Sequence, residues 1–231
     1  TKAIARILHA SETSFAVLGQ EESCTGDPAK RAGNEFLYQM QAAQNIATLN
    51  GYAIKRIITG CPHCFNVLKN EYPELGGNYE VLHHTQFIRE LIETGKLRMA
   101  DGAPFRGKRI TFHDPCYLGR GNGEYLAPRE VIQKLDAELL EMRRCKQNAM
   151  CCGAGGAQMF KEAENGNAEV NHERTNEALE NKPEVIATGC PFCNTMITDG
   201  VKNANQESEV EVKDIAELIA EAADLLDPSA S

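Results

Sequence analysis

Short apolar runs alternate with longer amphipathic segments along most of the chain. Residues 54–59 and 184–188 are rich in β-branched side chains and have the length of buried strands. Similar patterns predict further strands at residues 15–18, 79–82, 109–113, around Leu139 and at 209–212. Apolar residues at helical spacing predict helices at residues 2–10, 27–51, 85–93, 126–135, 159–181, 191–204 and 213–226, and a further helix that ends at residue 71.

The predicted helix at residues 27–51 has recognisable signals at both ends. Asp27 is a favourable N-cap residue, and Pro28 suits the first helical position. Asn50 followed by Gly51 is typical of a helix end. The side chains expected on the buried face of this helix are Phe36, Met40, Ala43 and Ala47.

The alternation of strands and helices predicts an α/β fold with mainly parallel sheets flanked by helices. We expect two pseudo-twofold-related lobes, residues 1–100 and residues 101–231, joined by the polar stretch at residues 95–107. In such sheets ligands collect at the carboxyl ends of the strands. The C-P-x-C sequences lie at two of these ends.

The second half of the chain repeats the first half. A β-branched run leads into Cys61-Pro62-His63-Cys64, and a similar run leads into Cys190-Pro191-Phe192-Cys193 129 residues later. Cys24 and Cys152 align at nearly the same offset. By the same offset, the counterpart of Cys116 would precede Thr1. We therefore expect a strand and one ligand cysteine to be missing ahead of the first half.

Composition and charge exclude some classes of function. The chain of 231 residues has a net charge of −9 and lacks the basic footprint of a nucleic-acid-binding protein. No apolar run approaches the roughly 20 residues that a membrane-spanning helix needs. The nine cysteines are odd in number and cluster in C-C and C-x-x-C patterns, which are typical of a reducing compartment. We therefore predict a cytoplasmic protein.

The cysteines of the second half favour an iron–sulfur centre. There are five of them: Cys116, Cys151, Cys152, Cys190 and Cys193. A tetrahedral zinc site uses four ligands. Adjacent cysteines in an extended stretch point apart, so they reach different irons of one cluster more easily than one metal atom. Gly153 and Gly155 are expected to let the main chain approach the cluster closely.

These residues resemble the cysteine-rich CCG domain family. The family pattern is a lone cysteine, a C-C-G sequence and a C-x-x-C sequence, present twice. Its members include the catalytic iron–sulfur subunit of heterodisulfide reductase and iron–sulfur subunits of glycolate, lactate and glycerol-3-phosphate oxidation systems. The second half carries the pattern in full. In the first half, Ser23-Cys24-Thr25-Gly26 replaces C-C-G and the upstream cysteine is absent.

The resemblance implies a [4Fe-4S]-type cluster on the five second-half cysteines, either cubane or of the non-cubane form found in heterodisulfide reductase. Cys24, Cys61 and Cys64 would be metal ligands in the first half. With the missing cysteine present, they would hold a second [4Fe-4S] cluster. As the chain stands, three ligands predict a labile or empty first site.

The resemblance also implies an oxidoreductase or a subunit of one. Electrons would pass between a redox partner and a thiol, a disulfide or another small acceptor. The partner would be a flavoprotein dehydrogenase, an electron-transfer flavoprotein or a ferredoxin-like subunit. The competing interpretation is a relay subunit that only conducts electrons for a flavin dehydrogenase.

Two further alternatives come from the residues themselves. Each half could bind structural zinc through its C-x-x-C sequence and two more thiols. A strand followed by C-P-H-C and a helix is also typical of thioredoxin-like dithiol oxidoreductases. That interpretation leaves the Cys151-Cys152 pair unexplained.

Candidate catalytic residues lie near Cys116. His113 could tune a cluster by hydrogen bonding, relay a proton or simply cap a strand end. Arg120 could offset the charge of a cluster, bind an anionic substrate or be a solvated surface residue. Cys145 falls outside the repeated pattern and is interpreted as a bystander thiol.

Overall fold

The computed structural model describes residues 1–100, 104–162 and 165–225. In this part of the chain the α-helices are α1 (Lys2–Ala10), α2 (Asp27–Arg31), α3 (Glu35–Gly51), α4 (Pro62–Asn66), α5 (His84–Glu93), α6 (Gly119–Asn122), α7 (Leu126–Gln133), α8 (Val170–Glu180), α9 (Pro191–Asn203) and α10 (Ile215–Ala222). The strands are β1 (Arg56–Thr59), β2 (Glu80–His83), β3 (Arg109–Phe112), β4 (Glu138–Leu140), β5 (Val185–Thr188) and β6 (Glu211–Asp214). Helix α4 continues into a π-helical turn at Val67–Glu71.

All strand pairs are parallel, and they form two sheets. Strands β1 and β2 make a two-stranded sheet, and the second sheet has the order β4-β3-β5-β6. The β1–β2 pair corresponds to the β5–β6 pair: Thr59 lies opposite His83 in the first, and Thr188 lies opposite Asp214 in the second. Helices connect these parallel strands, as parallel pairing requires. The predicted α/β class is confirmed.

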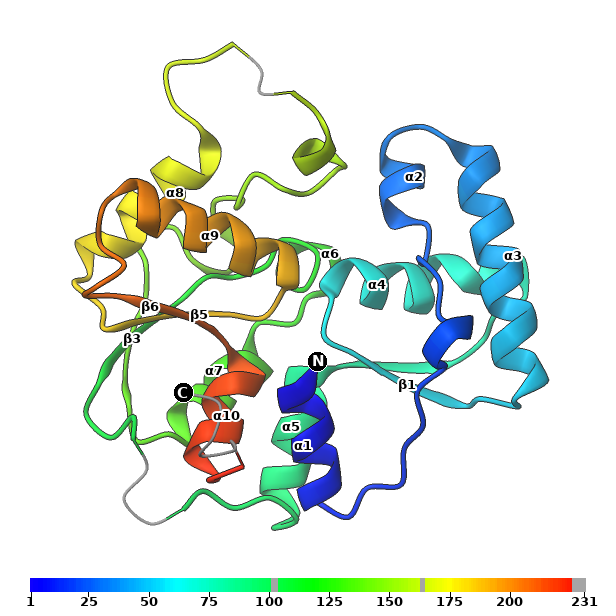
Figure 1. The fold of residues 1–231 in the computed structure, drawn as a ribbon, viewed down its shortest axis with the longest axis horizontal. Coiled ribbons are helices and arrows are strands. Elements are labelled where there is room, and N and C mark those ends of the chain that lie inside the picture. The colour runs from blue at the N-terminus through cyan, green and yellow to red at the C-terminus, as the bar shows by residue number, and fades with distance from the viewer. Residues whose placement is uncertain (101–103, 163–164, 226–231) are drawn as a thin grey trace.

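The two sheets share one layer of helices. Helices α1, α5, α7 and α10 lie together at one side of the molecule, beneath both sheets (Figure 1). Ile58 of β1 and Val185 of β5 point into the same apolar core as Ile7 of α1 and Leu218 of α10. A single hydrophobic core therefore spans both halves of the chain, so the halves cannot be pulled apart without exposing it.

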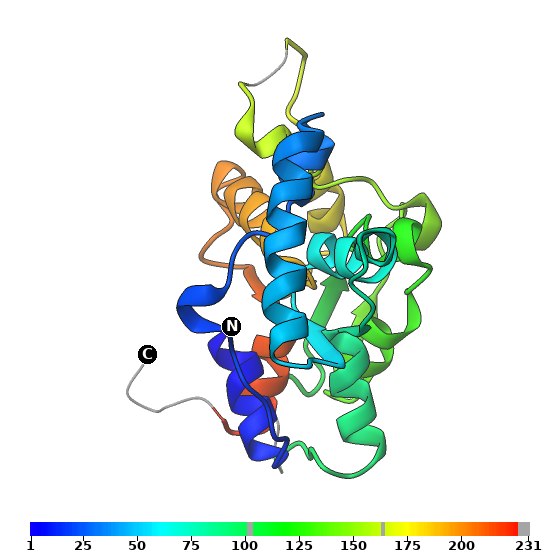
Figure 2. The ribbon, with the colours of Figure 1, turned by 90° about the vertical axis from the view of Figure 1, so that its right-hand side faces the viewer.

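The other face of each sheet has its own cover. Strand neighbours point to opposite faces, so Ile57 of β1 packs with Tyr38 of α3 while Ile186 of β5 packs with Ile197 of α9. Helix α3 stands alongside α4 over the first sheet, and α8 and α9 lie over the second (Figures 1 and 2). The carboxyl ends of β1, β3 and β5 thus face the boundary between residues 1–100 and residues 104–225, which is called the seam below.

Several predicted elements differ from the structure. Residues 15–18 form no strand, and Val17 is 75% exposed because no partner strand adjoins it in the described chain. The predicted helix at 27–51 is broken at Gly33, whose φ of +83° ends α2, and Asn34 then caps α3. Its predicted apolar face is wrong: Phe36 is 76% exposed. The buried residues of α3 are Tyr38, Ala42, Asn45, Ile46 and Leu49.

The remaining boundaries differ by smaller amounts, with one exception. The predicted helix at 159–181 begins only at Val170, and residues 163–164 of that range lie outside the described residues. Residue 226, the predicted end of the last helix, and residues 101–103 of the predicted linker also lie outside them. The described residues of the linker contain no helix or strand.

Candidate metal centre

The two C-P-x-C sequences occupy equivalent positions at strand ends. Cys61 follows β1 and is the N-cap residue of α4, while Cys190 follows β5 and is the N-cap residue of α9. Pro62 and Pro191 take the first helical positions, where a missing amide hydrogen costs nothing. Each sulfur pair therefore lies at the amino terminus of a helix, where the helix dipole favours thiolates.

The other thiols of the second half reach the same place from two loops. Cys116 follows β3, the central neighbour of β5, and Cys151 and Cys152 belong to the loop between β4 and α8. Cys116 lies within interaction range of Cys151, Cys151 of Cys152, and Cys152 of Cys193. All five predicted second-half ligands are thus brought together, and none of the nine cysteines, all within the described residues, forms a disulfide.

Crowding of these thiols shifts their pKa values in opposite directions. Hydrogen bonds from Cys116 and Cys152 lower the pKa of Cys151 far below its usual range. The same bond, together with burial, raises the pKa of Cys116. The bond to Cys151 raises the pKa of Cys152 to about 11. The close approach of these thiols opposes the ionisation of all of them together, and a bound cation would relieve this conflict.

Two first-half cysteines join this group. A hydrogen bond with Cys190 raises the pKa of Cys61 to about 12. Burial raises the pKa of Cys190, but its bonds with Cys193 and Cys61 outweigh burial and bring that pKa to about 5. Cys61 also interacts with Cys64 through a hydrogen bond, and this hydrogen bond is the main cause of the raised pKa of Cys64. The thiols of both halves consequently form one connected chain across the seam.

Cys24 is less closely integrated. Its side chain is exposed, and its sulfur accepts a long hydrogen bond of 3.5 Å from the amide of Gly26. The next residue, Thr25, donates from its hydroxyl to the sulfur of Cys64 at 3.4 Å. Cys24 therefore lies in the neighbourhood of Cys64 without a direct bond to another thiol in the described chain.

The glycines of the C-C-G-A-G-G stretch serve two different purposes. Gly153 has a φ of +94°, which L side chains rarely adopt, and its amide donates to the sulfur of Cys151 at 3.3 Å. At Gly155 a Cβ would lie 3.9 Å from the sulfur of Cys116 and 3.6 Å from His63 Cε1. The bare backbone at Gly155 therefore leaves free the space beside the sulfur of Cys116.

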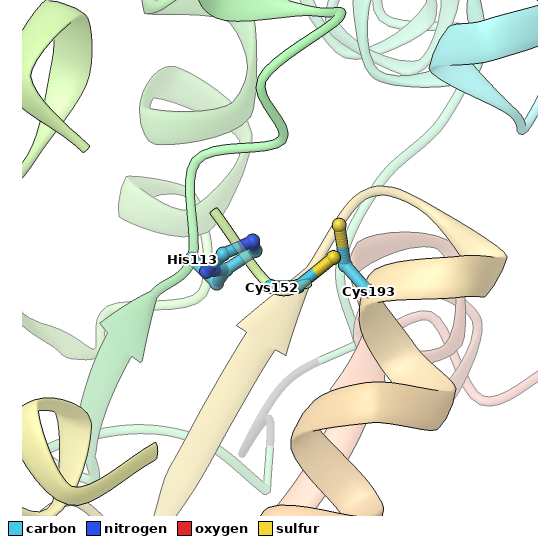
Figure 3. Close-up of side chains that lie close together, drawn as sticks. All are labelled: His113, Cys152 and Cys193. Carbon is cyan, nitrogen blue, oxygen red and sulfur yellow. The ribbon is translucent and has the colours of Figure 1, made fainter. Parts of the chain in front are cut away.

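His113 lies directly against the cysteines. One of its ring nitrogens and the sulfurs of Cys152 and Cys193 all lie within 4.8 Å of one another, and all three residues are buried. Figure 3 shows the imidazole at the end of β3, with a nitrogen on the side of the two sulfurs. Burial, followed by the nearby charge of Arg174, lowers the pKa of His113 to about 3, so its ring is neutral.

Arg120, the other candidate catalytic residue, lies near Cys116. Its side chain is largely exposed and donates a hydrogen bond to the carbonyl of Ala149, just ahead of the C-C-G sequence. Its charge acts to lower the pKa of Cys116, although larger effects raise that pKa overall. Arg120 thus ties the loop of Cys151 to α6.

A buried ion-pair network supports the site, and sequence reasoning missed it. Arg129 of α7 makes two hydrogen bonds of 2.8 Å to Asp114, and it also pairs with Glu141. Asp114 in turn accepts from the amide of Lys146 at 2.8 Å. This network fixes the backbone between His113 and Cys116. The adjacency of Asp114 to a strand end was the available signal. Cys145 lies beside this network, apart from the other thiols.

His63, the third residue of the first C-P-H-C sequence, was also missed. Its Nδ1 lies 2.8 Å from the carboxylate of buried Asp27, and its ring stacks on Tyr117 at a centroid distance of 4.2 Å. Phe192, its counterpart in the second C-P-x-C sequence, meets it edge-on at 5.3 Å. His63 therefore fills the seam between the two motifs. A histidine inside a cysteine motif was the signal for it.

Comparison with known proteins identifies the family. The model of the cysteine-rich domain named CCG matches residues 1–69 and 110–198. The chain belongs to this family. Both matched stretches contain a C-P-x-C sequence, and the second contains all five of the predicted second-half ligands.

Named relatives of this CCG-domain chain are redox proteins. It is 44% identical to the EtfAB:quinone oxidoreductase of Syntrophomonas wolfei over 96% of the chain and 31% of that protein. It is 45% identical to the probable iron-sulfur-binding oxidoreductase FadF of Bacillus subtilis over 94% of the chain and 30% of that protein. One of the subunits of the dihydromethanophenazine:CoB–CoM heterodisulfide reductase of Methanosarcina barkeri is 35% identical, over 95% of the chain and 54% of that protein.

The chain spans about a third of the first two relatives and about half of the third. Among the described residues, none of the helices combines the length and the apolar character required to cross a bilayer.

Proposed function

We propose that this chain is the CCG-domain part of an iron–sulfur oxidoreductase and that its clustered cysteines hold an iron–sulfur cofactor. The observation that carries the proposal is the connected chain of thiols from Cys116 through Cys193 and Cys190 to Cys61. Names of relatives that contain the words iron-sulfur, quinone oxidoreductase and heterodisulfide reductase support it. We also propose that residues 1–100 and 101–231 are the two repeats.

The residues present fit such a cofactor. Thiolates are the ligands that iron–sulfur clusters use, and here they come from separate loops that meet at strand ends. In this proposal Cys116, Cys151, Cys152, Cys190 and Cys193 hold a [4Fe-4S]-type cluster. Cys24, Cys61 and Cys64 contribute to a second site. Gly153 shapes the loop of Cys151, and Gly155 leaves room beside Cys116.

When bound, such a cluster takes up and releases single electrons. The chain's own residues would hold it away from water, since Cys152, Cys190 and Cys193 are buried. Buried His113 would present a ring nitrogen to it. The names of the relatives support a redox partner protein and a disulfide acceptor. In this proposal the partner is a flavoprotein dehydrogenase, an electron-transfer flavoprotein or a ferredoxin-like subunit, and the acceptor is a thiol or a disulfide. A cytoplasmic location remains a prediction from the cysteine content.

Anaerobic reconstitution with iron and sulfide tests the proposal. We expect the chain to retain iron together with acid-labile sulfide and to give an electron paramagnetic resonance signal in one redox state. Cys152→Ser should abolish or alter that signal. Cys145→Ser is the matched control, because Cys145 is a partly buried cysteine outside the thiol chain, and it should behave as the wild type. Zinc without acid-labile sulfide would refute the proposal.

A second assay separates catalysis from relay. If the chain takes part in disulfide chemistry, the chemically reduced, reconstituted protein should reduce a small disulfide at a rate that depends on Cys152. If the chain is a relay, it should exchange electrons with a reduced flavoprotein and leave the disulfide untouched. A reconstituted chain that does neither would contradict both forms of the proposal.

A further inference from the structure

Arg174 is a fully buried arginine, and no part of its side chain reaches the solvent. It lies on α8, has a relative exposure of 0%, and donates from Nη1 to Glu177 at 3.0 Å and to the carbonyl of Arg144 at 2.8 Å. Its Nε donates to Nδ1 of His113 at 3.0 Å. Glu177 offsets the charge of this buried guanidinium, but the contact of Arg174 with an imidazole calls for an explanation beyond packing.

The chemistry of this contact fixes the proton on His113. A guanidinium carries five N–H donors and no acceptor. Nδ1 of His113 must therefore offer a lone pair to Arg174, and the single ring proton of the neutral imidazole must be on Nε2. Arg174 thereby selects one of the two tautomers.

The protonated nitrogen is the one left for the cysteines. Nε2 of His113 is buried and has no hydrogen-bond partner among the described residues. With Nδ1 held by Arg174, Nε2 is the nitrogen available to the group in which His113, Cys152 and Cys193 lie within 4.8 Å of one another. A buried N–H without an acceptor is costly, which favours a hydrogen bond from this nitrogen to a neighbouring sulfur.

The same contact argues against His113 as a metal ligand. A histidine that binds a metal through one nitrogen almost always donates its other N–H to a carboxylate, a carbonyl or water. Here the partner of Nδ1 is itself a donor. Coordination through Nε2 would leave the ring without any proton, beside a cation.

We propose that Arg174 is a positioning residue that holds His113 in the Nε2-protonated form, and that His113 donates an N–H···S hydrogen bond to the cofactor-binding sulfurs of Cys152 and Cys193. The tautomer is a property of the chain alone, whereas the effect on a bound cluster rests on the proposed function. Hydrogen bonds to sulfur stabilise the more negative, reduced state. The pair Arg174–His113 should therefore raise the reduction potential of the centre.

Nitrogen-15 NMR of the metal-free wild-type chain tests the tautomer directly. We expect the His113 ring to show a protonated Nε2 and an unprotonated Nδ1. The opposite tautomer would overturn the inference while leaving the proposed function intact. Failure to bind iron would refute the proposed function and leave the tautomer standing.

Variants test the consequence for the reconstituted centre. Arg174→Met and His113→Leu should both lower its reduction potential, and Arg174→Met should also mix the two tautomers. His113→Gln keeps an N–H near the position of Nε2, so its reduction potential should lie between those of His113→Leu and the wild type. The matched control is Arg144→Gln, because Arg144 pairs with the same Glu177 but does not touch His113. An unchanged potential in His113→Leu would overturn the inference, and the NMR measurement remains decisive if Arg174→Met does not fold.

Discussion

A single methyl group at Gly200 would test how closely α8 and α9 pack. A Cβ at Gly200 would overlap Thr175 Oγ1, and it would lie 2.8 Å from Thr175 Cβ and 3.2 Å from the backbone oxygen of Asn171. Non-bonded carbon atoms are normally about 3.5–4.0 Å apart. Gly200→Ala must therefore separate the two helices or distort them, because the obstacle includes the β-carbon of one residue and the backbone of another.

Two effects of this substitution oppose each other. Overpacking a core typically costs about 1–3 kcal/mol, and the overlap here places the cost at the upper end. Alanine gains about 1 kcal/mol over glycine in a helix interior. We expect a net loss of about 2 kcal/mol in the free energy of unfolding. Because α9 carries Cys193 and α8 carries Arg174, the substitution should also weaken iron retention.

Urea unfolding of the metal-free chain measures the loss. With a slope of about 2 kcal/mol per molar urea, the midpoint should fall by about 1 M. Thr175→Ala removes the nearest atom, a buried hydroxyl with no hydrogen-bond partner among the described residues. In the Thr175→Ala background, Gly200→Ala should lower the free energy of unfolding by a smaller amount. An unchanged midpoint, or the same loss in both backgrounds, would show that the helices are not in the close contact described.

Three further predictions concern the seam and the loops. Cys61→Ser should weaken iron retention by the second-half thiols by about tenfold, because the thiol of Cys61 forms a hydrogen bond with that of Cys190. If the Cys61→Ser and Cys145→Ser variants retained equal amounts of iron, this contact would be contradicted. His83 is fully buried and its pKa lies well below 6.5, so below about pH 6.5 the unfolded chain binds a proton that the folded chain does not. Between about pH 6.5 and 5.5 the wild type should lose about 1 kcal/mol more stability than His83→Gln, and equal losses in urea titrations would count against a buried neutral ring. Gly153→Ala should destabilise more than Gly156→Ala, since both have positive φ but only at Gly153 does a Cβ meet another residue, at 3.2 Å; thermal unfolding of the two variants compares them.

The strand-ending motifs were predictable because they are local. The β-branched runs before Cys61 and Cys190, and the proline after each of these cysteines, determine a strand, a turn and a helix without reference to the rest of the chain. The capping residue Asn34 and the left-handed Gly33 were equally local, yet they went unrecognised because apolar residues on both sides suggested one continuous helix.

Contacts across the seam were not predictable in this way. The repeat suggested one thiol group in each half, whereas the fold places Cys61 against Cys190, 129 residues away. Similarly, neither the pairing of Arg174 with His113 nor that of Arg129 with Asp114 has a fixed spacing in sequence. Such pairs depend on how the helices pack on a sheet, and the spacing of apolar residues in one sequence does not predict this packing.

His83 and Asp214 occupy equivalent register positions and cap α5 and α10, yet each also reaches into the opposite half. Nε2 of His83 forms a hydrogen bond of 3.0 Å with the carbonyl of Gly189, and the carboxylate of Asp214 comes within 3.1 Å of Nε2 of His84 without forming a hydrogen bond to it. Separation of the two halves would therefore remove the hydrogen bond between His83 and the carbonyl of Gly189 and would take the carboxylate of Asp214 away from His84. A substitution at either position would thus be felt in both halves of the chain.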